Sequence, residues 1–262
     1  MMEERDRRVL DLAVGAGRVL LECGAEISRV EDTMHRIAAN YGVAESQQYV
    51  CSNSIFQTAV NDRRQMYAKV NYVPLADVQL DKVDAVNRLS REIAQGKWSV
   101  EEAELELERI RTMPGKRRIA RLLGSSFGSA GFCYIFGGTL LDCVAAFLAG
   151  MVVYLFLLFL ERREKKTAKL LVNIAGAFIG TGVGTLLWRI GVGDQYSAIV
   201  TGAIMPLLPG VPFVNAIRDV GNGDYLAGTV RFIDAALVLI GIAMGVIAFF
   251  VLYSELGGVL QL

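Results

Sequence analysis

Three prolines and a glycine fall within seven residues of an apolar stretch, and this feature constrains the fold more than any other. The stretch Pro206–Asp219 reads PLLPGVPFVNAIRD and lies between two long apolar runs. Each proline removes a backbone donor and clashes with the preceding helical turn, so a regular helix cannot continue through it. Inside a bilayer, broken backbone survives only where protein or a water-filled cavity satisfies it. Transporters build binding sites from interrupted helices, so the sequence predicts a membrane protein with a translocation site in its C-terminal third.

The chain has two compositional halves. Residues 1–121 carry 19 Lys or Arg and 19 Asp or Glu, whereas residues 122–262 carry only 8 of each. This division predicts a soluble domain over 1–115 and a membrane domain over 116–262. Net charge is near zero, which gives no indication of nucleic-acid binding. The charged N-terminus does not resemble a secretory signal peptide.

The soluble domain shows the periodicities of four helices and a hairpin, which indicates an α+β fold. Apolar residues from Val9 to Cys23 recur at three- and four-residue spacing and predict the buried face of a first helix. Val30, Met34 and Ile37 give the buried face of a second. A third helix is expected over roughly residues 76–95, and a fourth follows it.

Two capping boxes are expected to open helices in this domain. Ser28 with Glu31 would open the second helix, and Ser99 with Glu102 would open the fourth. In such a box the two side chains satisfy orphan backbone donors reciprocally.

A change of period to two predicts a strand near residue 70. We expect it to pair with the stretch Gln48–Val60 across a turn at Asn61 and Asp62. Its apolar face, expected to point to the core, consists of Met66, Ala68, Val70 and Tyr72.

Beyond Pro114 the chain is apolar on all sides of its predicted helices, which favours about five transmembrane helices, one of them broken by prolines. Each run comes near the roughly 20 residues that a bilayer-crossing helix needs. The spans are expected over about residues 119–140, 140–160, 168–190, 195–213 and 228–253.

Orientation follows from the positions of Lys and Arg, which favour the cytoplasmic side. Eleven of them precede the first span, separate the second from the third, or follow the prolines, and only Arg189 lies on the other side. The sequence therefore predicts a cytoplasmic N-terminal domain and an external C-terminus.

Glycines at four-residue spacing in the third span predict close helix packing, because small residues let helix backbones approach. They are Gly176, Gly180 and Gly184. A glycine-lined path is the alternative interpretation.

No catalytic or metal-binding constellation emerges from the sequence. The segment Gly124–Gly128 matches a nucleophile-elbow pattern around Ser126, but that motif needs a preceding strand and a histidine partner, and the single histidine is His35. Four cysteines lack metal-type spacing, which favours reduced thiols without a disulfide framework. We therefore expect no cofactor.

Ionisable residues within or beside the spans are candidates for function, because such charges are costly unless they face a bundle interior or a cavity. Arg231 and Asp234, three residues apart, could neutralise each other. The alternative is a solvated loop for Asp219, Asp224 and Arg231. The expected substrate and coupling site consists of Pro209, Gly210, Pro212, Asn215, Asp219, Asp224, Arg231 and Asp234.

These residues also carry a resemblance. The segment Pro209–Asp219, followed by Gly223, Asp224, Gly228 and Arg231, resembles the signature of the threonine/serine exporter family. The N-terminal segments Gly24–Glu26, Arg29–Glu31 and Ser52–Ile55 are similar to that family's amino-terminal half. A chain of five spans resembles the larger subunit of the split form, which implies a small all-membrane partner and links to export of dicarboxylates such as succinate.

The resulting hypothesis is a subunit of a secondary exporter for small polar acids in the bacterial inner membrane. The broken helix would offer backbone groups to the substrate, Asn215 would orient it, Arg231 would counter its charge and Asp219 would carry a coupling proton. An odd number of spans leaves no internal inverted repeat, so a partner or a homo-oligomer would complete the path. The rivals are a membrane-anchored hydrolase using Cys51 or Ser52 near His35, and a non-transporting scaffold or sensor.

Overall fold

The computed structural model describes residues 4–43, 46–60, 66–74, 78–162 and 168–255. The chain divides into two compact units. The first combines residues 1–115 with Gly210–Ile233, and the second combines Lys116–Pro209 with Asp234–Leu262. The expected turn at Asn61 and Asp62 lies outside the described residues.

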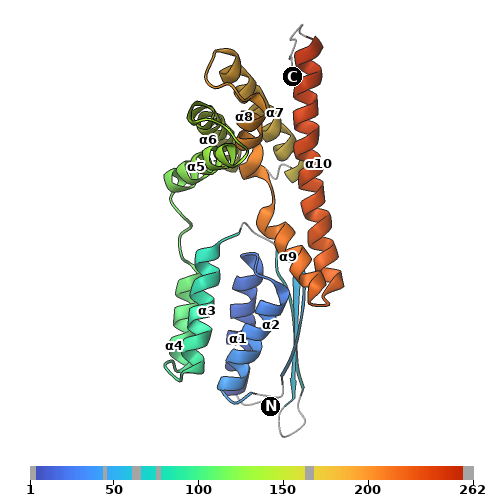
Figure 1. Ribbon diagram of the computed structural model, residues 1–262. Coiled ribbons are helices and arrows are strands. Elements are labelled where there is room, and N and C mark those ends of the chain that lie inside the picture. The colour runs from blue at the N-terminus through green and yellow to red at the C-terminus, as the bar shows by residue number, and fades with distance from the viewer. Residues whose placement is uncertain (1–3, 44–45, 61–65, 75–77, 163–167, 256–262) are drawn as a thin grey trace. The chain divides into compact units, whose positions relative to one another are not determined.

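In the first unit, the first two helices of the chain lie on one face of a small antiparallel sheet (Figure 1). Its elements are α1 (Glu4–Glu22), α2 (Ile27–Asn40), β1 (Ser46–Cys51), β2 (Ser54–Val60), β3 (Met66–Tyr72), α3 (Leu80–Ala94), α4 (Val100–Arg111), α9 (Gly210–Gly221) and the start of α10 (Tyr225–Glu255). The strands follow the order β1-β2-β3, so the stretch expected to form one partner strand forms two.

The helical faces predicted by periodicity form the core of the first unit. Val9, Leu20, Val30 and Met34 are among the residues with no exposed surface. Ser99 and Glu102 form the expected capping box at the start of α4. These predictions are confirmed.

The capping box expected at the start of α2 is wrong. The N-cap residue is Glu26, and its side chain makes no capping hydrogen bond. The Ser28 hydroxyl instead accepts a hydrogen bond from Asn222 at 3.1 Å, and the Glu31 carboxylate accepts one from the Val50 N–H at 2.9 Å. Contacts made across the fold override the local pattern.

The face of β3 expected in the core is the exposed one. Val70 and Tyr72 are 66% and 68% exposed. The opposite face carries Tyr67 and Lys69, whose hydroxyl and ammonium groups both donate to Asp11 of α1. Long amphipathic side chains can cover apolar surface with their stems while their polar ends find a partner, so alternation alone did not identify the inner face.

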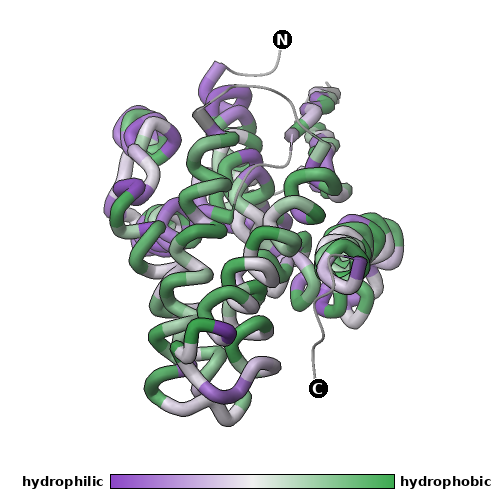
Figure 2. Tube along the Cα trace, turned by 90° about the horizontal axis from the view of Figure 1, so that it is seen from above, coloured by the Kyte–Doolittle hydropathy of each residue, from purple (hydrophilic) through white to green (hydrophobic). Residues whose placement is uncertain are grey.

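The second unit contains long apolar helices (Figure 2). Its elements are α5 (Arg118–Ile135), α6 (Leu140–Arg162), α7 (Lys169–Arg189), α8 (Tyr196–Ile204), the 3₁₀ turn Met205–Leu207 and the remainder of α10. In the described part of the chain, α6, α7 and α10 are long and apolar enough to span a membrane. A fourth span results if Tyr196–Leu207 and Gly210–Gly221, on either side of the break at Leu208 and Pro209, are counted as one bent span.

Three or four of the about five expected spans therefore qualify by length and composition in the described residues. The helix α5 is not among them. Arg118 and Arg121 lie in its first turn, and three glycines and three serines lower the hydropathy of its middle.

Glycines of the second unit lie where helices approach closely. A Cβ added at Gly180 would come within 3.0 Å of Val153, and one at Gly176 or Gly184 would come within 3.3 Å of Leu207 or Val200. Distances this short leave no room for a larger side chain unless a neighbour shifts.

Replacing Gly180 with leucine should lower the amount of folded protein, because the added side chain must displace Val153 of α6. The control is Gly124→Leu in α5, where an added Cβ meets nothing within 4 Å. The measurement is monodisperse protein recovered in mild detergent and its melting temperature. Equal recovery of the two variants would contradict the packing role of Gly180.

Candidate functional site

A polar network in the first unit joins the loop between α1 and α2 to α9 and α10. The loop begins at Gly24, whose φ of +80° favours glycine. Gly24 N–H bonds to Leu21 C=O and Ala25 N–H bonds to Leu20 C=O, a Schellman ending for α1. The carbonyls of Gly24 and Ala25 are then free to accept hydrogen bonds from other elements.

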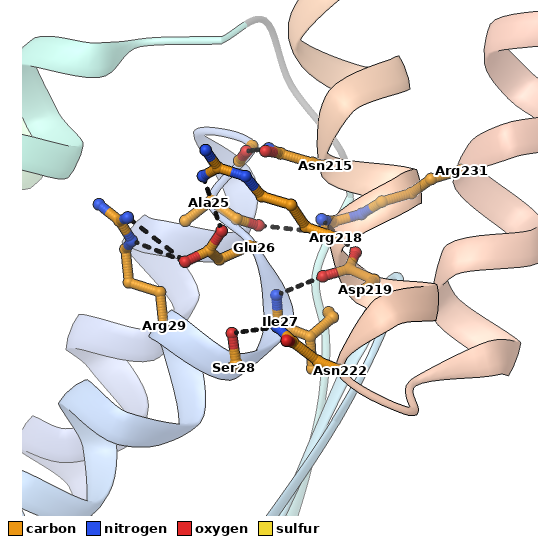
Figure 3. Close-up of polar contacts among 11 residues, drawn as sticks. Ala25, Glu26, Ile27, Ser28, Arg29, Asn215, Arg218, Asp219, Asn222 and Arg231 are labelled. Carbon is orange, nitrogen blue, oxygen red and sulfur yellow. Dashed lines mark hydrogen bonds and ion pairs between the residues drawn. The ribbon is translucent and has the colours of Figure 1, made fainter.

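Those carbonyls are bound by side chains far along the chain (Figure 3). Asn215 of α9 donates its amide N–H to the Gly24 carbonyl at 2.7 Å. Arg231 of α10 donates one guanidinium N–H to the Ala25 carbonyl at 2.9 Å. The loop is thereby attached to both C-terminal helices of the unit.

Asp219 connects the same helices to the start of α2. One carboxylate oxygen accepts from the Ile27 N–H at 3.0 Å, and the other accepts from Arg231 at 2.8 Å. Ile27 is the first residue of α2, so its N–H is one of the donors that a helix leaves unpaired. A carboxylate at this end also interacts favourably with the helix dipole. Asp219 therefore takes the capping role that the sequence assigned to Ser28.

The ion pair of Asp219 with Arg231 is buried. Asp219 has no exposed surface and Arg231 is 5% exposed. Removing one member of such a pair leaves an unpaired buried charge, which costs about 3–5 kcal/mol. The expected pairing of Arg231 with Asp234 is wrong, because Arg231 reaches Asp219 on the neighbouring helix while Asp234 is exposed.

More exposed contacts surround the buried pair. The Glu26 carboxylate accepts hydrogen bonds from Arg29 and from Arg218 of α9, the latter at 3.2 Å. Asn222 donates to the hydroxyl of Ser28. Exposed ion pairs of this kind contribute at most about 1 kcal/mol each, so the buried pair dominates the energetics of the network.

The remaining expected site residues do not enter this network directly. Pro209 belongs to the second unit, and Gly210 and Pro212 lie in the first turn of α9. The Asp224 backbone N–H bonds to the Asp219 carbonyl, and its own carbonyl receives Gly228 N–H. The structure thus brings together Asn215, Asp219 and Arg231 out of the predicted set.

The segment Gly24–Glu26 carries part of the family resemblance, but the sequence did not indicate that this loop contacts the site. Its two acceptors are backbone carbonyls at Gly24 and Ala25, and its donor is the Ile27 N–H. Backbone groups carry no residue-type signal. The available signal was Gly24, which lies directly after a strongly periodic helix, where a glycine indicates a helix C-terminus.

An apolar cavity of about 330 Å³ lies beside this network, between α9 and α10. It is lined by Ala216, Ile217, Val220, Thr229 and Phe232. Apart from one threonine these side chains have no polar group, so the cavity lacks the charged partners that would bind a charged substrate.

Two further polar residues in the second unit have structural roles. Asp142 is fully buried at the start of α6, and its carboxylate accepts from the Thr139, Asp194 and Gln195 N–H groups. Ser126 lies inside α5 and donates to the Leu122 carbonyl, which is not the strand-to-helix turn of a nucleophile elbow.

In the described part of the chain, the residues proposed for a hydrolase do not form an assembled catalytic site. His35 is exposed on α2, and no hydrogen bond joins it to Cys51 or Ser52 in the residues that the structure describes. The four cysteines are free. Within the same residues, no group of three His, Cys, Asp or Glu side chains could hold a metal ion.

A family model described as "Putative threonine/serine exporter" matches residues 11–253. The chain belongs to the threonine/serine exporter family. This match covers both units and the whole polar network, and it confirms the resemblance inferred from the proline-rich motif. The family is one of transporters, and together with the apolar helices it places the chain in a membrane.

Curated relatives fall into two lengths. The "Threonine/serine exporter" of Corynebacterium glutamicum is 25% identical over 245 residues, which cover 91% of this chain and 50% of that protein. The "Probable succinate transporter subunit YjjP" is 23% identical in Klebsiella aerogenes, over 94% of both chains. The Escherichia coli protein of the same name is also 23% identical, over 94% of this chain and 95% of that one.

The chain therefore spans about half the length of the first exporter relatives that it matches. It matches the succinate transporter subunits over nearly their full length. No solved structure matches the chain.

A second carboxylate near the network is Glu31 on α2. Burial raises the pKa of the Glu31 carboxyl, and the nearby Asp224 charge raises it further, while the hydrogen bond from the Val50 N–H lowers it. The net direction is upward. The folded protein then holds a proton on Glu31 over a pH range in which the unfolded chain, with a pKa of about 4.3, has released it.

The sign of the pH effect follows from this difference. Stability contributed by protonated Glu31 is lost as pH rises from the unfolded pKa through the raised folded pKa. Glu31→Gln keeps an oxygen acceptor for Val50 N–H and removes the titration. We expect its melting temperature to exceed that of the unmodified protein at neutral pH, with the difference vanishing near pH 4.

Thermal melts of the full chain in detergent between pH 4 and pH 8 measure this effect. The control is Glu31→Ala, which leaves the Val50 N–H unpaired and should be destabilised at every pH. A Glu31→Gln curve parallel to that of the unmodified protein would contradict the assignment.

Proposed function

We propose that this chain is one subunit of a proton-coupled secondary exporter for small polar acids in the bacterial inner membrane. The candidate substrates are serine, threonine and dicarboxylates such as succinate, which are named in its relatives. All of them present a carboxylate, and a buried arginine is a suitable partner for a carboxylate. The proposal includes no catalytic step.

The buried Asp219–Arg231 pair is the observation that carries the proposal. Arg231 already binds one carboxylate, that of Asp219, beside the N–H of a helix N-terminus. A substrate carboxylate presents the same chemistry and can replace Asp219 on Arg231. Once displaced, the Asp219 carboxylate takes up a proton, because an unpaired charge buried at this depth is costly. Substrate binding and protonation are linked in this way.

Displacement of Asp219 also changes the contacts of the loop. The Ile27 N–H loses its charged acceptor, and the arginine that holds the Ala25 carbonyl changes partner. We propose that the soluble part of the chain responds to substrate through this loop, as a gate. Asn215, which holds the Gly24 carbonyl, positions the loop and orients the substrate.

The proposed site is narrower than the expected one. Asn215, Asp219 and Arg231 form its centre, and Asp224 modulates the charge of Asp219, to which its backbone is bonded. Pro209, Gly210 and Pro212 set the break before α9. Asp234 lies exposed on α10, away from the buried pair.

A second membrane component completes the path in this proposal. The chain covers half of the exporter relatives and nearly all of the relatives named as subunits. We therefore propose assembly with a small membrane subunit, a second copy, or both. The excess of Lys and Arg on one side favours a cytoplasmic N-terminal unit and an external C-terminus.

Three variants of the buried pair test this proposal in cells loaded with labelled serine or succinate. Asp219→Asn and Arg231→Gln should each abolish export driven by an imposed proton gradient, since each removes one member of the exchange. Both also leave an unpaired partner, and each should lower stability by about 3–5 kcal/mol. The double variant removes both charges and should recover part of that stability without recovering export.

Efflux is normalised to the protein present in the membrane, and stability is measured on the same samples. Asp32→Asn on α2, an exposed carboxylate paired with Arg36, is the control that should export normally. Recovery of export together with stability in the double variant would show that the pair is only structural and would overturn the proposal.

A further inference from the structure

Within the residues that the structure describes, one face of the sheet in the first unit is exposed. The helices α1 and α2 contact β2 and β1 from the other side (Figure 1). Strand register arranges the open face in three rows. These rows are Gln47–Thr58–Ala68, Tyr49–Phe56–Val70 and Cys51–Ser54–Tyr72.

The open face combines two properties that are unusual together. None of the nine side chains in the three rows carries a formal charge. The central row is apolar, with Tyr49 at 54% exposed, Phe56 at 40% and Val70 at 66%. An exposed, flat and uncharged sheet surface promotes aggregation unless it is covered.

We infer that this face binds the same face of a second copy of the chain. Two identical sheets can pack face to face with their strands nearly aligned and their side chains interdigitated. A two-fold axis lying between the two faces and parallel to the central strand would bring each apolar row against its own counterpart, the self-complementary arrangement of most protein dimers.

The absence of charge favours a second copy over other occupants. Surfaces that bind anionic lipid carry Lys and Arg around an apolar face, and the three rows have neither. A different protein is selected largely by complementary charge, which this face does not offer. Two copies of it meet without burying any charge, and tyrosine is enriched at such interfaces.

The size of the face sets the strength of the contact. Three strands about 4.8 Å apart and about seven residues long present roughly 14 by 24 Å. That is on the order of half of the ~800 Å² that each partner buries in a standard stable interface. The sheet contact alone is therefore weak in solution, and confinement of both copies in one membrane raises their effective concentration.

Cross-linking in native membranes tests the inference with the full chain. Thr58 is exposed in the central strand, next to the expected two-fold axis. In a background without the four native cysteines, Thr58→Cys should form a disulfide-linked dimer under mild oxidation. Leu105→Cys on α4, which is 74% exposed and away from the sheet, should remain monomeric.

A second set of variants introduces a charge on the open face. Adding Val70→Lys to Thr58→Cys should remove most of the cross-linked dimer, since two copies would then bury like charges. Adding Leu105→Lys instead should leave the yield unchanged. Equal melting temperatures of these variants would exclude misfolding as the cause of a loss.

Three outcomes would overturn the inference. Cross-linking of Thr58→Cys at no higher yield than Leu105→Cys is the first. A Thr58→Cys product with a polypeptide of different size would assign the face to another partner. A yield that is unchanged by Val70→Lys would show that the two faces do not meet.

Discussion

The buried ion pair of Asp219 with Arg231 is the interaction on which the organisation of the first unit depends. It brings α9 and α10 against the loop between α1 and α2, and the contacting residues are separated by 192 and 206 positions in the chain. A charge buried to this degree is stable only while its partner remains. The pair thus acts as a link that holds strongly when both charges are present and is lost when one is neutralised, which is the property a proton-coupled transporter needs.

The sequence was most informative where a physical pattern is local. Helical faces in the soluble half, the capping box at Ser99 and the interruption at the prolines all follow from neighbouring residues. The family followed from the resemblance of the segment Pro209–Asp219 to its signature, and the ionisable groups beside the spans indicated a site. Asn215 and Asp219 were selected as site residues from this segment, and Arg231 was selected from the span that follows it.

The sequence was less informative where contacts span the chain. The partners of Asp219 and Arg231 include backbone groups of Ala25 and Ile27, which no pattern announces. The inner face of β3 was inverted, since Tyr67 and Lys69 reach Asp11 on α1 and leave the apolar residues outside. Charge spacing within α10 suggested Asp234 as the partner of Arg231, whereas the packing of α9 supplied Asp219.

The proposed gate requires the loop to separate from α9 during transport, and a covalent lock between the start of α2 and the end of α9 would prevent this. Ser28 and Asn222 are joined by a 3.1 Å hydrogen bond at the exposed edge of the network. Cysteines at both positions, in a background without native cysteines, can be bridged by a short cleavable thiol reagent. We predict that bridging stops export and that cleavage restores it. Export at the unbridged rate by fully bridged protein would contradict the account.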